Sequence, residues 1–207
     1  MKIFEMRLVW KLLCFYLLSS PLQADLDLHA SVADKESQPQ KPRSWSLQQH
    51  SLALELVPHS PKEIKGFFIA RGFPARIAEE ISQQCVFQVV IKNSVAESSE
   101  AKIERPLLTV SLKQWRVRHQ GVVKAMKLKE QWDAEWTQGL VSDAARLAFR
   151  WATFPSEQEF APVGDYAWGM ITVGLPPDEP FALQVVWQEG KQAFTQWIEN
   201  MRCPKDY

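Results

Sequence analysis

The stretch FALQVVWQEGKQAFTQWIENM, residues 181–201, decides the fold class of this chain. Apolar and polar residues alternate on both sides of Glu189-Gly190, as in two half-buried β-strands joined by a two-residue turn. With this turn, Gln188 pairs with Lys191 across the hairpin. One face of the hairpin then belongs to the core and carries Phe181, Leu183, Val185, Trp187, Phe194 and Ile198. The other face is mostly polar.

The chain before this hairpin contains further segments with strand periodicity. Residues 167–175 form the strand that precedes it, and residues 52–56 alternate in the same way. The valine-rich run 85–91 is typical of a buried strand. Residues 108–112 alternate again and are expected to continue as one strand past residue 117, ending near Gly121.

Four helices are predicted between these strands. Ser60, Pro61 and Glu63 form the N-cap, first-turn proline and capping-box partner of the first helix. A second helix opens at Pro74, residues 127–138 have helical spacing, and Ser142 caps a helix that runs to about residue 152. Since strands outnumber helices without regular strand–helix–strand alternation, a parallel sheet is disfavoured. We predict a mainly β protein, an antiparallel β-sandwich of immunoglobulin-like or barrel-like form with inserted α-helices.

The N-terminus predicts export. Residues 1–24 combine a short basic start, an apolar run and a small-residue end at Ala24, which is typical of a secretory signal peptide. Residues 25–44 are polar and proline-containing and are expected to be a disordered lead-in, and residues 45–207 to form a single β-rich domain. The destination is the periplasm in a Gram-negative source and the extracellular space otherwise.

Export determines how the cysteines are interpreted. Cys14 lies in the leader, so Cys85 and Cys203 remain in an oxidising compartment and are expected to form a disulfide. No segment after the leader is apolar enough to cross a membrane, so no membrane span is expected in the mature chain.

Charge and motifs narrow the function classes. The chain has 24 basic and 24 acidic residues and a formal net charge of zero, which gives no electrostatic reason to expect nucleic-acid binding. The common signatures of serine hydrolases, zinc proteases, nucleotide-binding loops, thiol oxidoreductases and c-type haem attachment are missing from the sequence. We therefore expect a non-enzymatic protein with no cofactor.

Tryptophans supply the candidate binding residues. Trp132 and Trp136 lie one helical turn apart and form either an aromatic platform or a helix-to-sheet contact. Trp168 lies in the segment Gly164–Met170, whose glycines permit close approach of another backbone, and Asp165 in that segment is a candidate partner for Arg150. Trp197 is the ring on the polar face of the hairpin. Glu157 and Glu159 are interpreted as a solvated turn rather than a glycosidase pair.

A copper(I) site is the one metal site that the sequence suggests. Thioethers suit this ion, and Met126, Met170 and His119 are the candidate ligands. The competing interpretation is that the methionines fill gaps in the core.

The leading hypothesis is an exported, non-enzymatic accessory or binding protein that engages another envelope protein. A copper(I)-handling periplasmic protein and a carbohydrate-binding module are the alternatives. The sequence does not specify the oligomeric state.

Overall fold

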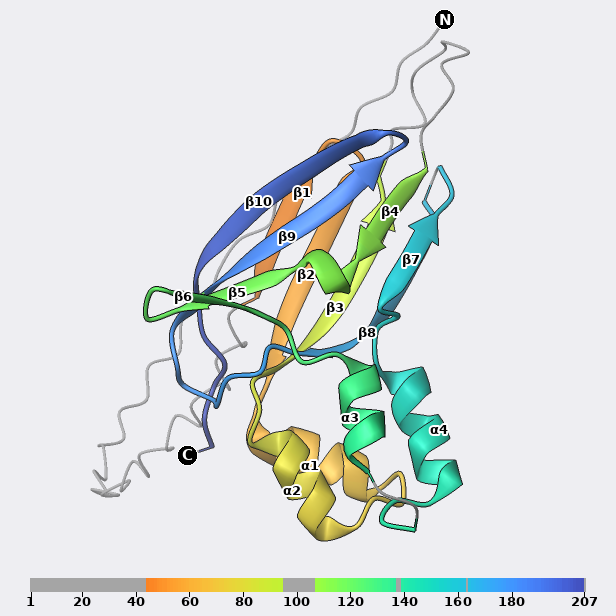
Figure 1. Cartoon of the computed structure of the whole chain (residues 1–207), viewed down its shortest axis with the longest axis vertical. Coiled ribbons are helices and arrows are strands. Elements are labelled where there is room, and N and C mark those ends of the chain that lie inside the picture. The colour runs from red at the N-terminus through yellow and green to blue at the C-terminus, as the bar shows by residue number, and fades with distance from the viewer. Residues whose placement is uncertain (1–43, 95–106, 137–138, 163, 207) are drawn as a thin grey trace, which may run out of the picture. The chain divides into compact units, whose positions relative to one another are not determined.

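The computed structural model describes residues 44–94, 107–136, 139–162 and 164–206 and confirms a mainly β fold (Figure 1). The predicted signal peptide and nearly all of the predicted lead-in lie outside the described residues. The first antiparallel sheet has the order β1-β2-β3-β8, with β1 Trp45–Gln49, β2 Leu52–His59, β3 Val86–Asn93 and β8 Tyr166–Thr172. The second sheet contains β4 Leu108–Ser111, β5 Arg116–His119, β6 Val122–Ala125, β7 Glu157–Phe160, β9 Phe181–Glu189 and β10 Gln192–Met201.

The long strand β9 organises the second sheet. β10 pairs along one of its edges, while β4 and β5 share the other edge end to end. β7 extends the sheet beside β4, and β6 extends it beside β5. In the described part of the chain, the two sheets do not close into a barrel, so the structure is sandwich-like.

The hairpin of β9 and β10 forms, but its predicted register is wrong. Glu189 pairs with Gln192, so the turn residues are Gly190 and Lys191 rather than Glu189 and Gly190. Gly190 has a φ of 58°, which glycine adopts without strain. Trp187 consequently faces Phe194, and the two rings stack with centroids 5.5 Å apart. Each β9 residue thus faces a β10 residue two positions beyond the predicted one. Because side chains alternate between the two faces of a strand, a shift of two positions leaves the predicted core-facing residues on the core face.

Two predicted segments also need correction. A 3₁₀ turn at Leu112–Gln114 splits the expected strand 108–117 into β4 and β5, and Gly121 lies in the tight turn before the unpredicted strand β6. Glu157 and Glu159 are in the edge strand β7 rather than a turn.

The apolar side chains form two clusters. One lies between the sheets and includes the fully buried rings of Trp115 and Trp187. The other joins the helices α1 Pro61–Ile69, α2 Ala75–Ser82, α3 Lys129–Glu135 and α4 Asp143–Ala152. Figure 1 shows these helices gathered at one end of the sheets. Val86 and Met170 from the first sheet belong to the helical cluster, so the helices are anchored on the sandwich.

The predicted disulfide is present. It joins Cys85, immediately before β3, to Cys203, two residues after β10, with the two Cα atoms 5.4 Å apart. It therefore ties the C-terminal end of the second sheet to the first sheet.

Candidate functional site

Helix α4 carries the most exposed large apolar side chain among the described residues. The helix begins at its N-cap, Ser142, whose Oγ accepts a hydrogen bond from the Ala145 amide at 3.2 Å. One face, with Ala145, Phe149 and Ala152, is buried in the helical cluster. The Thr153 hydroxyl donates to the Phe149 carbonyl at 2.8 Å and closes the C-terminal end. This face fixes the position and rotation of the helix.

A second apolar face of α4 is open to solvent. Residues at positions i, i+3, i+4 and i+7 lie along one side of a helix, and here they are Ala144, Leu147, Ala148 and Trp151. We call these four residues the α4 stripe. Leu147 is 43% exposed and Trp151 is 76% exposed. A helix that is buried on one face is normally polar on the rest of its surface, so this stripe is not explained by folding.

The basic residues of α4 are drawn away from the stripe. Arg146 donates to the Asp133 and Trp136 carbonyls at 2.9 and 2.8 Å, and its Nη2 lies 2.9 Å from Asp133 Oδ1. Arg150 binds the same carboxylate through Oδ2. The suggested pair between Arg150 and Asp165 is therefore wrong, because Asp165 accepts a hydrogen bond from the Ala161 amide instead. These contacts tie α4 to α3 and leave the stripe without charge.

Strand β8 exposes two further rings. Trp168 is 60% and Tyr166 63% exposed, both on the face of the first sheet that points away from the second sheet. Trp168 also borders a shallow groove of about 240 Å³, whose other lining residues are His59, Glu63, Ile64, Phe67, Gln88 and Met170. The close approach predicted for this segment occurs at Gly169, where an added Cβ would lie 2.5 Å from the Phe154 amide nitrogen.

Trp132 and Trp136 lie in the helical core. Each is only 4% exposed, Trp136 packs edge-on against Phe149 with centroids 4.8 Å apart, and Trp132 donates from Nε1 to the Thr172 hydroxyl at 3.0 Å. They form the helix-to-sheet contact rather than an exposed platform. Trp197 lies on the outer face of β10, half-buried, with the Arg118 guanidinium 4.5 Å above its ring.

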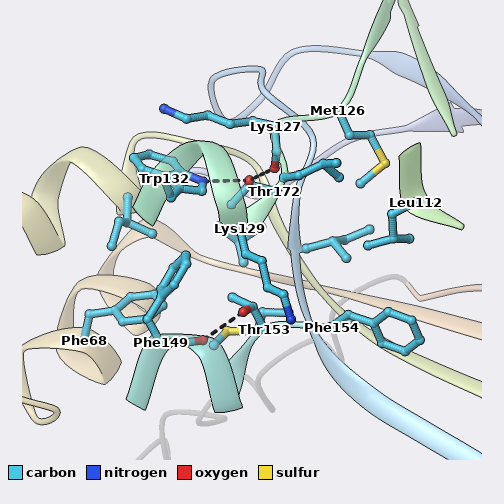
Figure 2. A pocket seen from close by; sticks show the side chains of 15 residues that line it. Phe68, Leu112, Met126, Lys127, Lys129, Trp132, Phe149, Thr153, Phe154 and Thr172 are labelled. Atoms are coloured by element: carbon cyan, nitrogen blue, oxygen red, sulfur yellow. Dashed lines mark hydrogen bonds between the residues drawn. The ribbon is translucent and has the colours of Figure 1, made fainter. Parts of the chain in front are cut away.

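The three candidate copper ligands do not share one cavity. Met126 and Met170 are buried and both line the cavity drawn in Figure 2, whereas His119 is not among its lining residues. His119 Nδ1 lies 2.9 Å from the Pro180 carbonyl oxygen, and Nε2 lies 3.7 Å from Glu179. Within the described ranges, no three His, Cys, Asp or Glu side chains are grouped so that they could hold a metal ion.

The cavity in Figure 2 is too small for a ligand. Its volume is about 20 Å³, enough for one water molecule. At its wall the Thr172 hydroxyl accepts from Trp132 and donates to the Lys127 carbonyl at 2.7 Å, so this hydroxyl and the indole N–H already have partners. The cavity is a packing gap between the helices and β8.

Comparison with known proteins gives no relative from which a function could be transferred. The chain matches no family model, no curated protein and no solved structure. No helix among the described residues is long and apolar enough to cross a membrane.

Sequence reasoning missed the α4 stripe although its signal was present. The helix has apolar residues at both spacings, the buried set at 145, 149 and 152 and a second set at 144, 147, 148 and 151, of which 148 is half-buried and the others are exposed. Periodicity shows that a helix is amphipathic but does not say which of two apolar faces meets the core. Only the tertiary contacts show which apolar face of α4 is buried.

Proposed function

We propose that this protein is an exported, non-enzymatic accessory protein that binds another envelope protein through the α4 stripe. The observation that carries the proposal is an uncharged apolar ridge on a helix whose core-facing side is already buried. A disulfide in the described domain fits an oxidising compartment, the periplasm or the extracellular space.

The stripe defines what the partner surface should look like. An apolar helix face with anchors at i, i+4 fits a hydrophobic groove or a second helix. Tryptophan is prominent among the residues that dominate binding energy at interfaces, and Trp151 is placed to fill a pocket on the partner. Because the core face, the cap and the Asp133 contacts hold α4 in place, little ordering cost is expected on binding.

The test is a cross-linked affinity capture of the tagged protein from its native envelope fraction. Wild type should capture one stoichiometric protein, and Trp151→Lys should reduce its recovery by about tenfold or more. The matched control is Thr195→Lys, which adds the same charge on the exposed outer face of β10 and should capture as wild type does. Equal recovery with all three proteins would contradict the assigned surface. Failure of wild type to capture a protein would contradict the function and favour a small ligand.

A further inference from the structure

The outer edge of β8 is open over a short length. In an antiparallel ladder, alternate residues bond to the neighbouring strand and the others point away from it. The Asn93 amide donates to the Asp165 carbonyl at 2.9 Å, and the Val173 amide donates to the Cys85 carbonyl at 3.1 Å. Odd-numbered residues of this strand therefore bond to the β3 side. The even-numbered residues, Tyr166 and Trp168 among them, direct their N–H and C=O groups outward.

The ends of this edge are already covered. The Met170 carbonyl accepts a hydrogen bond from the Phe154 amide at 2.9 Å, and Thr172 forms a bridge with Lys127. Before the strand, the chain turns at Gly164, whose φ is 84°. Within the described residues, the backbone groups of Tyr166 and Trp168 have no partner on this side. The open edge is thus limited to residues 166–168.

This open segment is complementary to itself. A two-fold axis through Ala167 would place Tyr166 of one copy opposite Trp168 of the other, and the reverse. Each facing pair would exchange two N–H···O=C bonds, using all the open groups and no covered one. A longer partner strand would continue into the chain at Thr153 and Phe154, whereas β8 of a second copy turns at its own Gly164, which this pairing places opposite Met170, and so does not continue past the start of the covered segment.

The side chains favour the same pairing. Tyr166 and Trp168 lie on one face of the sheet, so the pairing would bring two aromatic cross-strand pairs together. Residues 166–168 carry no charge and no proline, the features that commonly protect exposed edges. The edge strand β7, in contrast, carries Glu157 and Glu159 on its outer face.

We propose that two copies of this chain associate through the β8 edge, joining their first sheets into one continuous antiparallel sheet. Two-fold pairing of like surfaces is the commonest form of homo-oligomer. This interface is separate from the α4 stripe and concerns self-association, so it goes beyond the function proposed above.

Sedimentation velocity of the purified protein tests the proposal, over a range from about 1 µM to about 1 mM. Wild type should change from monomer to dimer within this range. Tyr166→Pro and Tyr166→Ala both remove the ring, but only proline removes the outward N–H, which an edge strand can lose without unfolding. Tyr166→Pro should therefore raise the dimer Kd at least about fivefold above that of Tyr166→Ala.

Two further measurements keep the test decisive if the proline variant does not fold. Trp168→Lys should abolish the dimer, because each Tyr166–Trp168 pair would lose its indole and two positive charges would be placed close together on one face of the joined sheet. In wild type, amide exchange at Tyr166 and Trp168 should slow with rising protein concentration, while Ala167 and Gly169, already bonded to β3, should not change. A monomer at every concentration, or a dimer indifferent to both Trp168→Lys and Tyr166→Pro, would overturn the proposal.

Discussion

At the scale of single residues, Gly169 is required because a backbone segment crosses β8 beside it. An added Cβ would lie 2.5 Å from the Phe154 nitrogen, 2.7 Å from its Cα and 2.8 Å from the Thr153 carbonyl carbon. All three atoms belong to the backbone and cannot move aside as a side chain could. The crossing positions α4 against the first sheet.

Gly169→Ala should therefore lower the free energy of unfolding by about 1–3 kcal/mol, the range for overpacking a buried site. Urea denaturation measures the change. Gly66→Ala is the matched control, because no atom lies within 4 Å of its added Cβ in helix α1 and it should be neutral or stabilising by about 0.5–1 kcal/mol. Equal effects of the two substitutions would argue against the crossing.

Glu79 is a carboxylate whose pKa is lowered mainly by one neighbour, Lys65. A hydrogen bond from Lys65, with Nζ 2.6 Å from Oε2, and a second from Gln83 hold the pKa of Glu79 below its usual value. A lowered folded-state pKa stabilises the protein above the unfolded pKa, and this contribution is lost as the pH falls through the folded value.

Lys65→Met should raise the pKa of Glu79 toward its usual value and weaken the dependence of stability on acidic pH. An NMR titration that follows the side-chain carboxyl carbon of Glu79 measures this pKa directly. Lys62→Met, which removes a charge from the same helix α1 without this contact, should leave the Glu79 titration where it is. If Lys65→Met shifted nothing, the ion pair between α1 and α2 would not form in solution.

At the scale of elements, the sequence predicted correctly those features that depend on residues close together in the chain. The capping box of Ser60 and Glu63 forms as its spacing indicates, and so does the alternation of the last hairpin. β6 and β7 were missed because they are four-residue edge strands with no buried run of their own. The break between β4 and β5 depends on how each pairs with β9 and on the Trp115 Nε1 hydrogen bond to the Val186 carbonyl, contacts distant in the sequence.

The candidate site was less predictable than the fold. Trp132 and Trp136 have the spacing of a platform, yet their place between helices and sheet makes them core. Trp151 lies on the exposed side of α4 only because Phe149 occupies the core side. Which of these rings is buried depends on contacts between elements distant in the chain, and these contacts cannot be read from the spacing of residues in one sequence.

The disulfide is the covalent link between elements of different sheets. The bond between Cys85 and Cys203 closes a loop across 118 positions, which in the chain-entropy model stabilises the folded state by about 4–5 kcal/mol. Replacing both cysteines by alanine should lower the unfolding free energy by that order, measured by denaturant titration. A reductant should destabilise wild type and leave the double variant unchanged. A reductant-insensitive wild type would contradict the bond.

At the scale of the whole described domain, the two apolar clusters have different roles. The cluster between the sheets forms the sandwich, and the helical cluster fixes α4 upon it through Val86 and Met170. A binding helix held on one face by a core and on another by ion pairs is preorganised. The sandwich is in this account a scaffold for the α4 stripe.

Site-specific photocross-linking in the native envelope tests that central claim most directly. A photoreactive amino acid at position 148, in the middle of the α4 stripe, should cross-link one protein other than this chain. The same group at position 195, on the outer face of β10, should not. Cross-links to that protein from both positions, or from position 195 alone, would contradict the α4 stripe as the binding surface.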